Sequence, residues 1–201
     1  MLLTKVGTRI RTGRRRGAFT LGEVIASVAV VAVLAAITIP TIKSRLAVGR
    51  ANALAKEIQS LAAGLQAFNN NTGTYPLYLD ELVTLPGSPN TYCGTVLTPV
   101  IMTAGQIAKW KGPYVSRLIA GDYVTADGNT VVDLMDRTTA GTPRFLEITV
   151  NNVALDVATV VEEVIDGPGA AFTSGNFKWT AGADPTMGNA VYRIVVPTTC
   201  V

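Results

Sequence analysis

The amino-acid sequence predicts an α+β fold in which one long N-terminal helix packs on a small antiparallel β-sheet head. Three observations predict this fold. Residues 21–42 form an almost uninterrupted apolar run. Residues 54–68 then carry apolar side chains at the spacing of one helix face. Beyond residue 122, short segments rich in β-branched residues alternate with turn signals, as antiparallel strands do.

The composition is that of a folded domain with an additional segment, and it argues against several classes of function. The chain has 201 residues, of which 48% are hydrophobic and 15% charged, so intrinsic disorder is not expected. It contains no His, which removes the commonest general base and the commonest metal ligand. The dinucleotide fingerprint and the phosphate-loop pattern are also absent from the sequence. We therefore predict no enzymatic activity and no cofactor.

The formal net charge of +3 is concentrated at the N-terminus. Six positive charges and no acid precede residue 17; they are Lys5, Arg9, Arg11, Arg14, Arg15 and Arg16. Subtracting these six from the 17 basic residues leaves 11 against 14 acidic ones, a net charge of −3 for the remainder. A body with this balance is not expected to bind nucleic acid.

The apolar run is long enough to suggest a membrane-spanning helix. Residues 24–39 contain no charge and two hydroxyl side chains, and with flanking residues they approach the ~20 residues that cross a bilayer. The arginines just before the run should stay in the cytoplasm, so everything after residue 42 should be exported. A buried core helix and a cleaved secretory signal are the alternatives. A signal would need small residues for cleavage after the run, where Pro40 and Thr41 stand instead.

Glu23 is the one charged residue at the start of this apolar run. A lone carboxylate there costs about 2–3 kcal/mol on insertion unless it stays at the headgroup level. The alternative is that it finds a cationic partner. A cut just upstream would create a new α-amino group, and that group could come from another subunit.

The segment from Arg16 to Glu23, RGAFTLGE, resembles the prepilin processing site of type IV pilins and type II secretion pseudopilins. In that family a basic leader ends in a small residue, and the mature chain begins Phe-Thr-Leu-x-Glu. The register places Glu23 on the family's glutamate and Pro40 on its helix-breaking proline. The resemblance implies cleavage between Ala18 and Phe19 and methylation of the Phe19 amine. The family prefers Gly at the position of Ala18, so cleavage after Gly17 is the alternative. Gly22 also departs from the family, which carries a bulky apolar residue there.

The resemblance implies a structural subunit of a type IV pilus-like filament. A prepilin peptidase would remove the leader, and the subunit would wait as a single-pass protein of the inner membrane with its head outside the cytoplasm. Assembly machinery would then polymerise it with copies of itself into an extracellular or periplasmic filament. The parts would be a leader (1–18), a transmembrane and filament-core helix (19–42), an amphipathic continuation (43–70) and a globular head (71–201). The alternatives are a pseudopilin of a type II secretion system and an exported binding protein on an uncleaved signal anchor.

The helix is expected to continue beyond the membrane segment for about fifty residues in total. Its buried face should carry apolar residues at spacings of four and three, namely Leu54, Ile58, Leu61, Leu65 and Phe68. It should end at residues 69–73, where Asn, Thr and Gly favour a cap. Pro40 removes one helical hydrogen bond, so a kink or local melting is expected near residues 36–40.

The head is predicted to contain several short elements. We expect helical turns at 80–83 and 104–110, a hairpin with an Asp-Gly turn at 123–133, and a helix at 156–165 with Asp156 as its N-cap. Further strands are expected at 145–150, 176–180 and 190–197. Glu162 and Glu163 are predicted to form a solvated face.

Two further sites are considered in the head. Cys93 and Cys200 would both face an oxidising space, where a disulfide would persist, although two unpaired small apolar residues are the alternative.

Asp127, Asn129 and Asp133 are the candidate ligands for a calcium ion. Their spacing does not match an EF-hand, and Asp-Gly-Asn is common in hairpin turns, so no metal is predicted.

Overall fold

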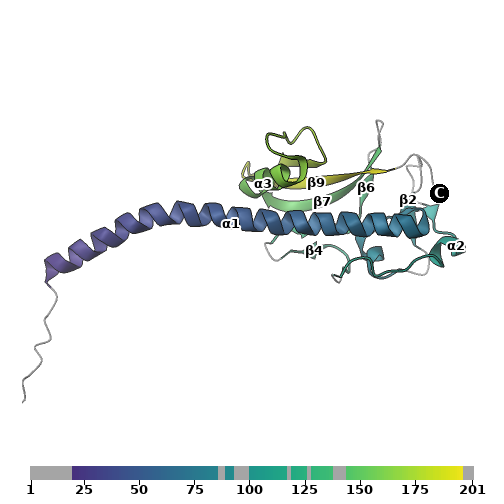
Figure 1. The fold of residues 1–201 in the computed structure, drawn as a ribbon, viewed down its shortest axis with the longest axis horizontal. Helices are drawn as coiled ribbons and strands as arrows, with labels where there is room; N and C mark the ends of the chain where they lie inside the picture. The colour runs from purple at the N-terminus through teal and green to yellow at the C-terminus, as the bar shows by residue number, and fades with distance from the viewer. Residues whose placement is uncertain are drawn as a thin grey trace, which may run out of the picture. The chain divides into compact units, whose positions relative to one another are not determined.

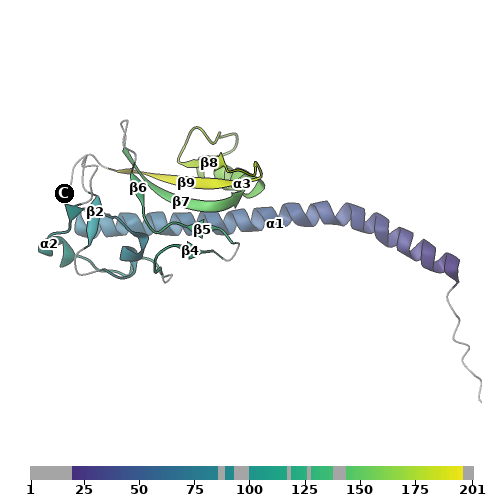
Figure 2. The same cartoon turned by 180° about the vertical axis from the view of Figure 1, so that it is seen from behind.

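The computed structural model describes residues 20–85, 89–92, 100–116, 119–125, 128–137 and 144–196. It confirms an α+β fold with a 52-residue helix, α1 (Leu21–Thr72), and antiparallel sheets (Figures 1 and 2). The chain divides into two compact units, Met1–Lys43 and Ser44–Val201. The second unit contains the sheets and the part of α1 that packs on them.

The second part of α1 supplies one side of the hydrophobic core. All five residues of the predicted stripe from Leu54 to Phe68 are buried, in one cluster with residues of the sheet such as Val131 and Ile148. The helix ends where the sequence predicts. The Gly73 N–H donates to the Asn69 carbonyl at 2.7 Å, and Gly73 has a φ of 77°. This left-handed conformation is the usual way to close a helix and favours Gly.

The helix runs without interruption through Pro40. Every residue from 36 to 40 is helical, so the local melting expected there is wrong. A proline has no backbone N–H, so Pro40 cannot donate to the carbonyl of Ala36 as a regular helix residue would. The Thr38 hydroxyl donates to the Leu34 carbonyl at 2.8 Å, and the Thr41 hydroxyl donates to the Ile37 carbonyl at 3.3 Å. Both bonds lie in the turns next to Pro40, and neither replaces the bond that Pro40 removes.

The main sheet has six antiparallel strands in the order β4-β5-β7-β9-β8, with β6 also paired to β7. Their bounds are β4 (Tyr123–Val124), β5 (Thr130–Val131), β6 (Asp136–Arg137), β7 (Arg144–Ala154), β8 (Phe177–Ala181) and β9 (Met187–Val196). The pair β7–β9 is the longest, and a cross-strand ion pair joins Glu147 and Arg193 at 2.7 Å. The predicted hairpin is confirmed as β4–β5, and the predicted strand at 145–150 is longer than expected.

A second, smaller sheet was not predicted. It has three strands in the order β1-β2-β3, namely β1 (Tyr75–Pro76), β2 (Asn90–Tyr92) and β3 (Val100–Ile101). Strands of two or three residues give no periodic signal. The short helices η1 (Leu79–Leu82) and α2 (Ala104–Ile107) lie close to where helical turns were expected.

Helix α3 (Leu155–Asp166) corrects two predictions. Its N-cap is Ala154, so Asp156 lies inside the first turn, where its Oδ1 accepts the Val157 N–H at 2.9 Å. Glu162 is 5% exposed, so it belongs to the packed side of the helix and not to a solvated face. The buried residues of α3 are Val157, Ala158, Val161 and Glu162, which have the i, i+1, i+4 and i+5 spacing of one helix face.

Aromatic side chains of the head pack into or against the core. Phe177 is fully buried, and Trp110 and Trp179 lie against the core cluster. The indole N–H groups are satisfied: Trp110 donates to the Glu81 carbonyl at 3.2 Å and Trp179 to the Val153 carbonyl at 3.0 Å. These rings therefore stabilise the head.

Candidate functional site

The first part of α1, residues 21–42, is the most distinctive surface of the first unit. Its large apolar side chains are exposed: Leu21, Val24, Ile25, Val28, Val30, Val31, Val33, Leu34, Ile37, Ile39 and Ile42. Successive residues of a helix are turned by about 100°, so this set covers every side of the helix. A helix that is apolar on all sides needs an apolar environment around it.

Among the described residues, α1 is the one helix long and apolar enough to span a membrane, and none of its most apolar window is buried. A core helix of a soluble protein would be mostly covered by its own chain. The three hydroxyl side chains of this segment do not oppose insertion. Ser27, Thr38 and Thr41 each donate to a carbonyl of the preceding turn. Glu23 is then the one charged group between residues 21 and 42.

Glu23 closes a capping box at the start of α1. The Thr20 N–H and the Thr20 hydroxyl donate to Glu23 Oε2 at 3.0 and 3.2 Å, and the Glu23 N–H donates to the Thr20 hydroxyl at 3.3 Å. This reciprocal pair satisfies backbone groups at the helix end, and the carboxylate also complements the positive end of the helix dipole. Threonine followed three residues later by glutamate is the sequence signature of this motif, so the capping role of Glu23 was predictable from the sequence.

The capping box still allows the Glu23 carboxylate to pair with a cation. Both bonds from Thr20 use the same oxygen, and a carboxylate has a second oxygen that can accept a further donor. The proposed processing residues Gly17, Ala18 and Phe19 lie outside the described residues. Cys93, Cys200 and Asp127 also lie outside them.

The calcium candidates that the structure describes serve other purposes. The backbone of Asn129 closes the β4–β5 turn, because its N–H donates to the Thr125 hydroxyl at 3.2 Å and its carbonyl accepts the Thr125 N–H at 2.8 Å. Asp133 Oδ1 accepts the Asp80 N–H at 2.8 Å, and the Asp133 N–H donates to Asp122 Oδ1 at 2.7 Å. In the described part of the chain, no three acidic, His or Cys side chains converge as a metal site would require.

Glu81 is a buried acid next to this network. Its side chain is 1% exposed, and its Oε2 accepts the Leu77 N–H at 3.1 Å. Burial raises the pKa of Glu81 to about 8, and the neighbouring carboxylates of Asp80 and Asp133 add to the rise. Burial likewise raises the pKa values of Asp80 and Asp133. Glu81 joins the turn after β1 to η1, so we assign it a role in the stability of the head.

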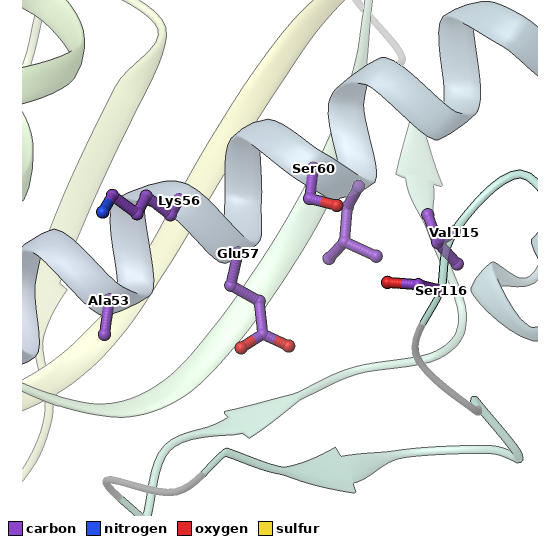
Figure 3. Close-up of a pocket in the computed structure, with 7 residues that line it drawn as sticks. Ala53, Lys56, Glu57, Ser60, Val115 and Ser116 are labelled. Atoms are coloured by element: carbon purple, nitrogen blue, oxygen red, sulfur yellow. The ribbon is translucent and has the colours of Figure 1, made fainter.

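A pocket of about 290 Å³ lies beside the buried part of α1 (Figure 3). Its polar lining includes Lys56, Glu57, Ser60 and Ser116. Figure 3 shows the Lys56 amine turned away from both serines. Glu57 Oε1 accepts the Tyr123 hydroxyl at 2.8 Å, which ties the β4–β5 hairpin to the helix. This arrangement suits a structural contact better than nucleophilic chemistry, which would need a base directed at a serine.

Comparison of the chain with known protein families, with curated proteins and with solved structures finds no match.

Proposed function

We propose that the chain is the precursor of a structural subunit of a type IV pilus-like filament. A prepilin peptidase cuts the basic leader before Phe19, and the apolar helix holds the subunit in the inner membrane with the head outside the cytoplasm. Assembly machinery then moves the helix from lipid into a bundle with the helices of other copies. The observation that carries the proposal is a helix that is apolar on every side and left uncovered by its own chain.

Two further features support a filament in preference to a simple anchor. The sequence FTLGE from Phe19 to Glu23 has the spacing of a pilin start. The carboxylate of Glu23 stands at the first turn of the apolar helix, where a neighbour's Phe19 amine could neutralise it as the helices bundle. A plain membrane anchor needs no acidic residue at this place. The type II pseudopilus is the alternative within the same mechanism, supported by the sequence around Tyr75-Pro76 and Gly112-Pro113-Tyr114.

A pair of matched substitutions tests the proposal. Val31→Arg puts a charge in the middle of the apolar helix, where it costs about 2.5–3.5 kcal/mol on insertion. Val48→Arg puts the same charge on the exposed side of α1 beyond the apolar segment. We expect Val31→Arg to lower the amount of the chain in membranes and in sheared surface fibres at least about tenfold relative to the wild type. The amount of the Val48→Arg chain in both fractions should stay within about twofold of the wild type. Electron microscopy and immunoblotting of both fractions measure the effect. Equal behaviour of the two variants would contradict the proposal.

A further inference from the structure

The C-terminal end of α3 carries an unusual set of charges. Glu162, Glu163 and Asp166 lie in or next to its last turn, and that turn contains no basic residue. The helix dipole places partial negative charge at this end, so a cation would be favourable there and a carboxylate is not. Asp166 is accounted for, because its two oxygens accept the N–H groups of Asn176 and Phe177 at 2.9 and 2.8 Å.

Glu162 is not accounted for in the same way. Its side chain is almost fully buried, and its Oε1 has no hydrogen-bond partner among the described residues. Burial raises the pKa of the Glu162 carboxyl, and the nearby Asp166 adds to the rise. A buried polar atom without a partner is costly, and such atoms are rare in folded proteins.

The unpartnered carboxyl lines a pocket of about 240 Å³, which we call the α3 pocket. The pocket is lined by Thr159, Glu162, Glu163, Gly167, Gly169 and Ala170. Two glycines and an alanine leave its mouth open, and its volume is several times the ~30 Å³ that one water occupies in the liquid. The end of a long basic side chain therefore fits, and it would find acceptors at Glu162 and Glu163.

We propose that the α3 pocket binds a basic side chain from residues 43–56 of a second copy of this chain. That segment carries four basic residues and no acidic one, namely Lys43, Arg45, Arg50 and Lys56. It directly follows the apolar segment, so bundling of the apolar helices brings it close to the heads of neighbouring copies. Its charge complements that of the pocket. The inference deepens the proposed function, because it requires the chain to polymerise.

The test uses the full-length chain in its own cells and measures sheared filament yield together with thermal unfolding of the extracted subunit. Glu162→Gln keeps the shape of the side chain and removes its charge. We expect it to lower filament yield about tenfold, which corresponds to ~1.4 kcal/mol, and to leave the melting temperature unchanged or higher. Asp156→Asn is the control, since it neutralises an exposed acid at the other end of the same helix.

The partner is identified by coupling. Each of Lys43→Gln, Arg45→Gln, Arg50→Gln and Lys56→Gln is combined with Glu162→Gln, and we expect one of the pairs to lose no more yield than Glu162→Gln alone. Wild-type yield of Glu162→Gln filaments would overturn the inference, and so would additive losses in every pair. Dissolution of wild-type filaments by a chelator would assign the pocket to a metal ion instead. If Glu162→Gln lowers the melting temperature, the test is repeated with Glu163→Gln, which changes an exposed acid of the same pocket. A wild-type filament yield of the Glu163→Gln variant would then overturn the inference.

Failure of the proposed function gives a different result. In that case the wild-type chain itself forms no filaments, whatever residue occupies position 162.

Discussion

Glu23→Ala is expected to reduce filament yield at least about tenfold without changing the melting temperature of the head. In the assembled state the side chain would neutralise the Phe19 amine of a neighbour in an apolar environment. Removing one member of a buried ion pair costs about 3–5 kcal/mol, since the other charge is left alone. The head is spared because Glu23 lies in the first of the two compact units. Sheared filament yield and thermal unfolding of the extracted subunit measure the two quantities.

Two companion variants separate pairing from helix capping. Glu23→Gln keeps an oxygen that can cap the helix and loses the charge, so pairing predicts a defect as large as that of Glu23→Ala. Thr20→Val removes the hydroxyl of the capping box and keeps the charge of Glu23. It should therefore lower the stability of the helix only by the ~1 kcal/mol that a cap contributes. The pairing role is refuted if Glu23→Gln assembles normally while Thr20→Val does not.

The unfolding free energy of the head is expected to fall as the pH rises from about 4.5 to about 8. In the unfolded chain Glu81 has its ordinary pKa of 4.5, whereas burial raises the pKa of the folded side chain to about 8. Between these values the folded state holds a proton that the unfolded state has released, so raising the pH favours unfolding. One unit of pKa difference corresponds to about 1.4 kcal/mol, which makes the effect measurable.

Glu81→Gln tests the source of this pH dependence. The amide resembles the protonated acid and can still accept the Leu77 N–H. The variant should be less sensitive to pH across this window and more stable than the wild type at pH 8. The pKa values of Asp80 and Asp133 are also raised in the folded state, so the two residues contribute to the pH dependence of the unfolding free energy in the same direction. Thermal unfolding over a pH series measures it, and an unchanged slope in Glu81→Gln would show that Glu81 is not the group responsible.

The long-range plan of the fold was readable from the sequence because it depends on periodicity. The stripe from Leu54 to Phe68 has the helical repeat, and all its members are buried. The Asn-rich end of α1 and the Gly-containing turn between β4 and β5 have strong local preferences, and both were predicted. These signals depend on a few neighbouring residues.

Features that depend on tertiary packing were not readable. The small sheet of β1, β2 and β3 pairs strands of two or three residues, which are too short to show the alternation of a strand. Glu162 and Glu163 are adjacent acids, and which of them is buried depends on which face of α3 packs against the rest of the head. The burial of Glu81 follows from the packing of η1 under Trp110, which no local pattern shows.

The functional site divides in the same way. The all-round apolar helix and its single acid were visible in the sequence, and the structure shows that no part of the described chain covers its most apolar window. The Thr20–Glu23 capping box was present in the sequence as a spacing of three residues, and it accounts for Glu23 at the helix start without a charged partner. The cleavage site and the cysteines stay predictions.

The N-terminal sequence of the chain recovered from membranes and from sheared fibres tests the central claim most directly. Cleavage of the leader predicts a mature protein that begins at Phe19 with a methylated amine, or at Ala18 if the cut follows Gly17. A chain that still begins at Met1 would contradict it, and so would one that begins beyond residue 40.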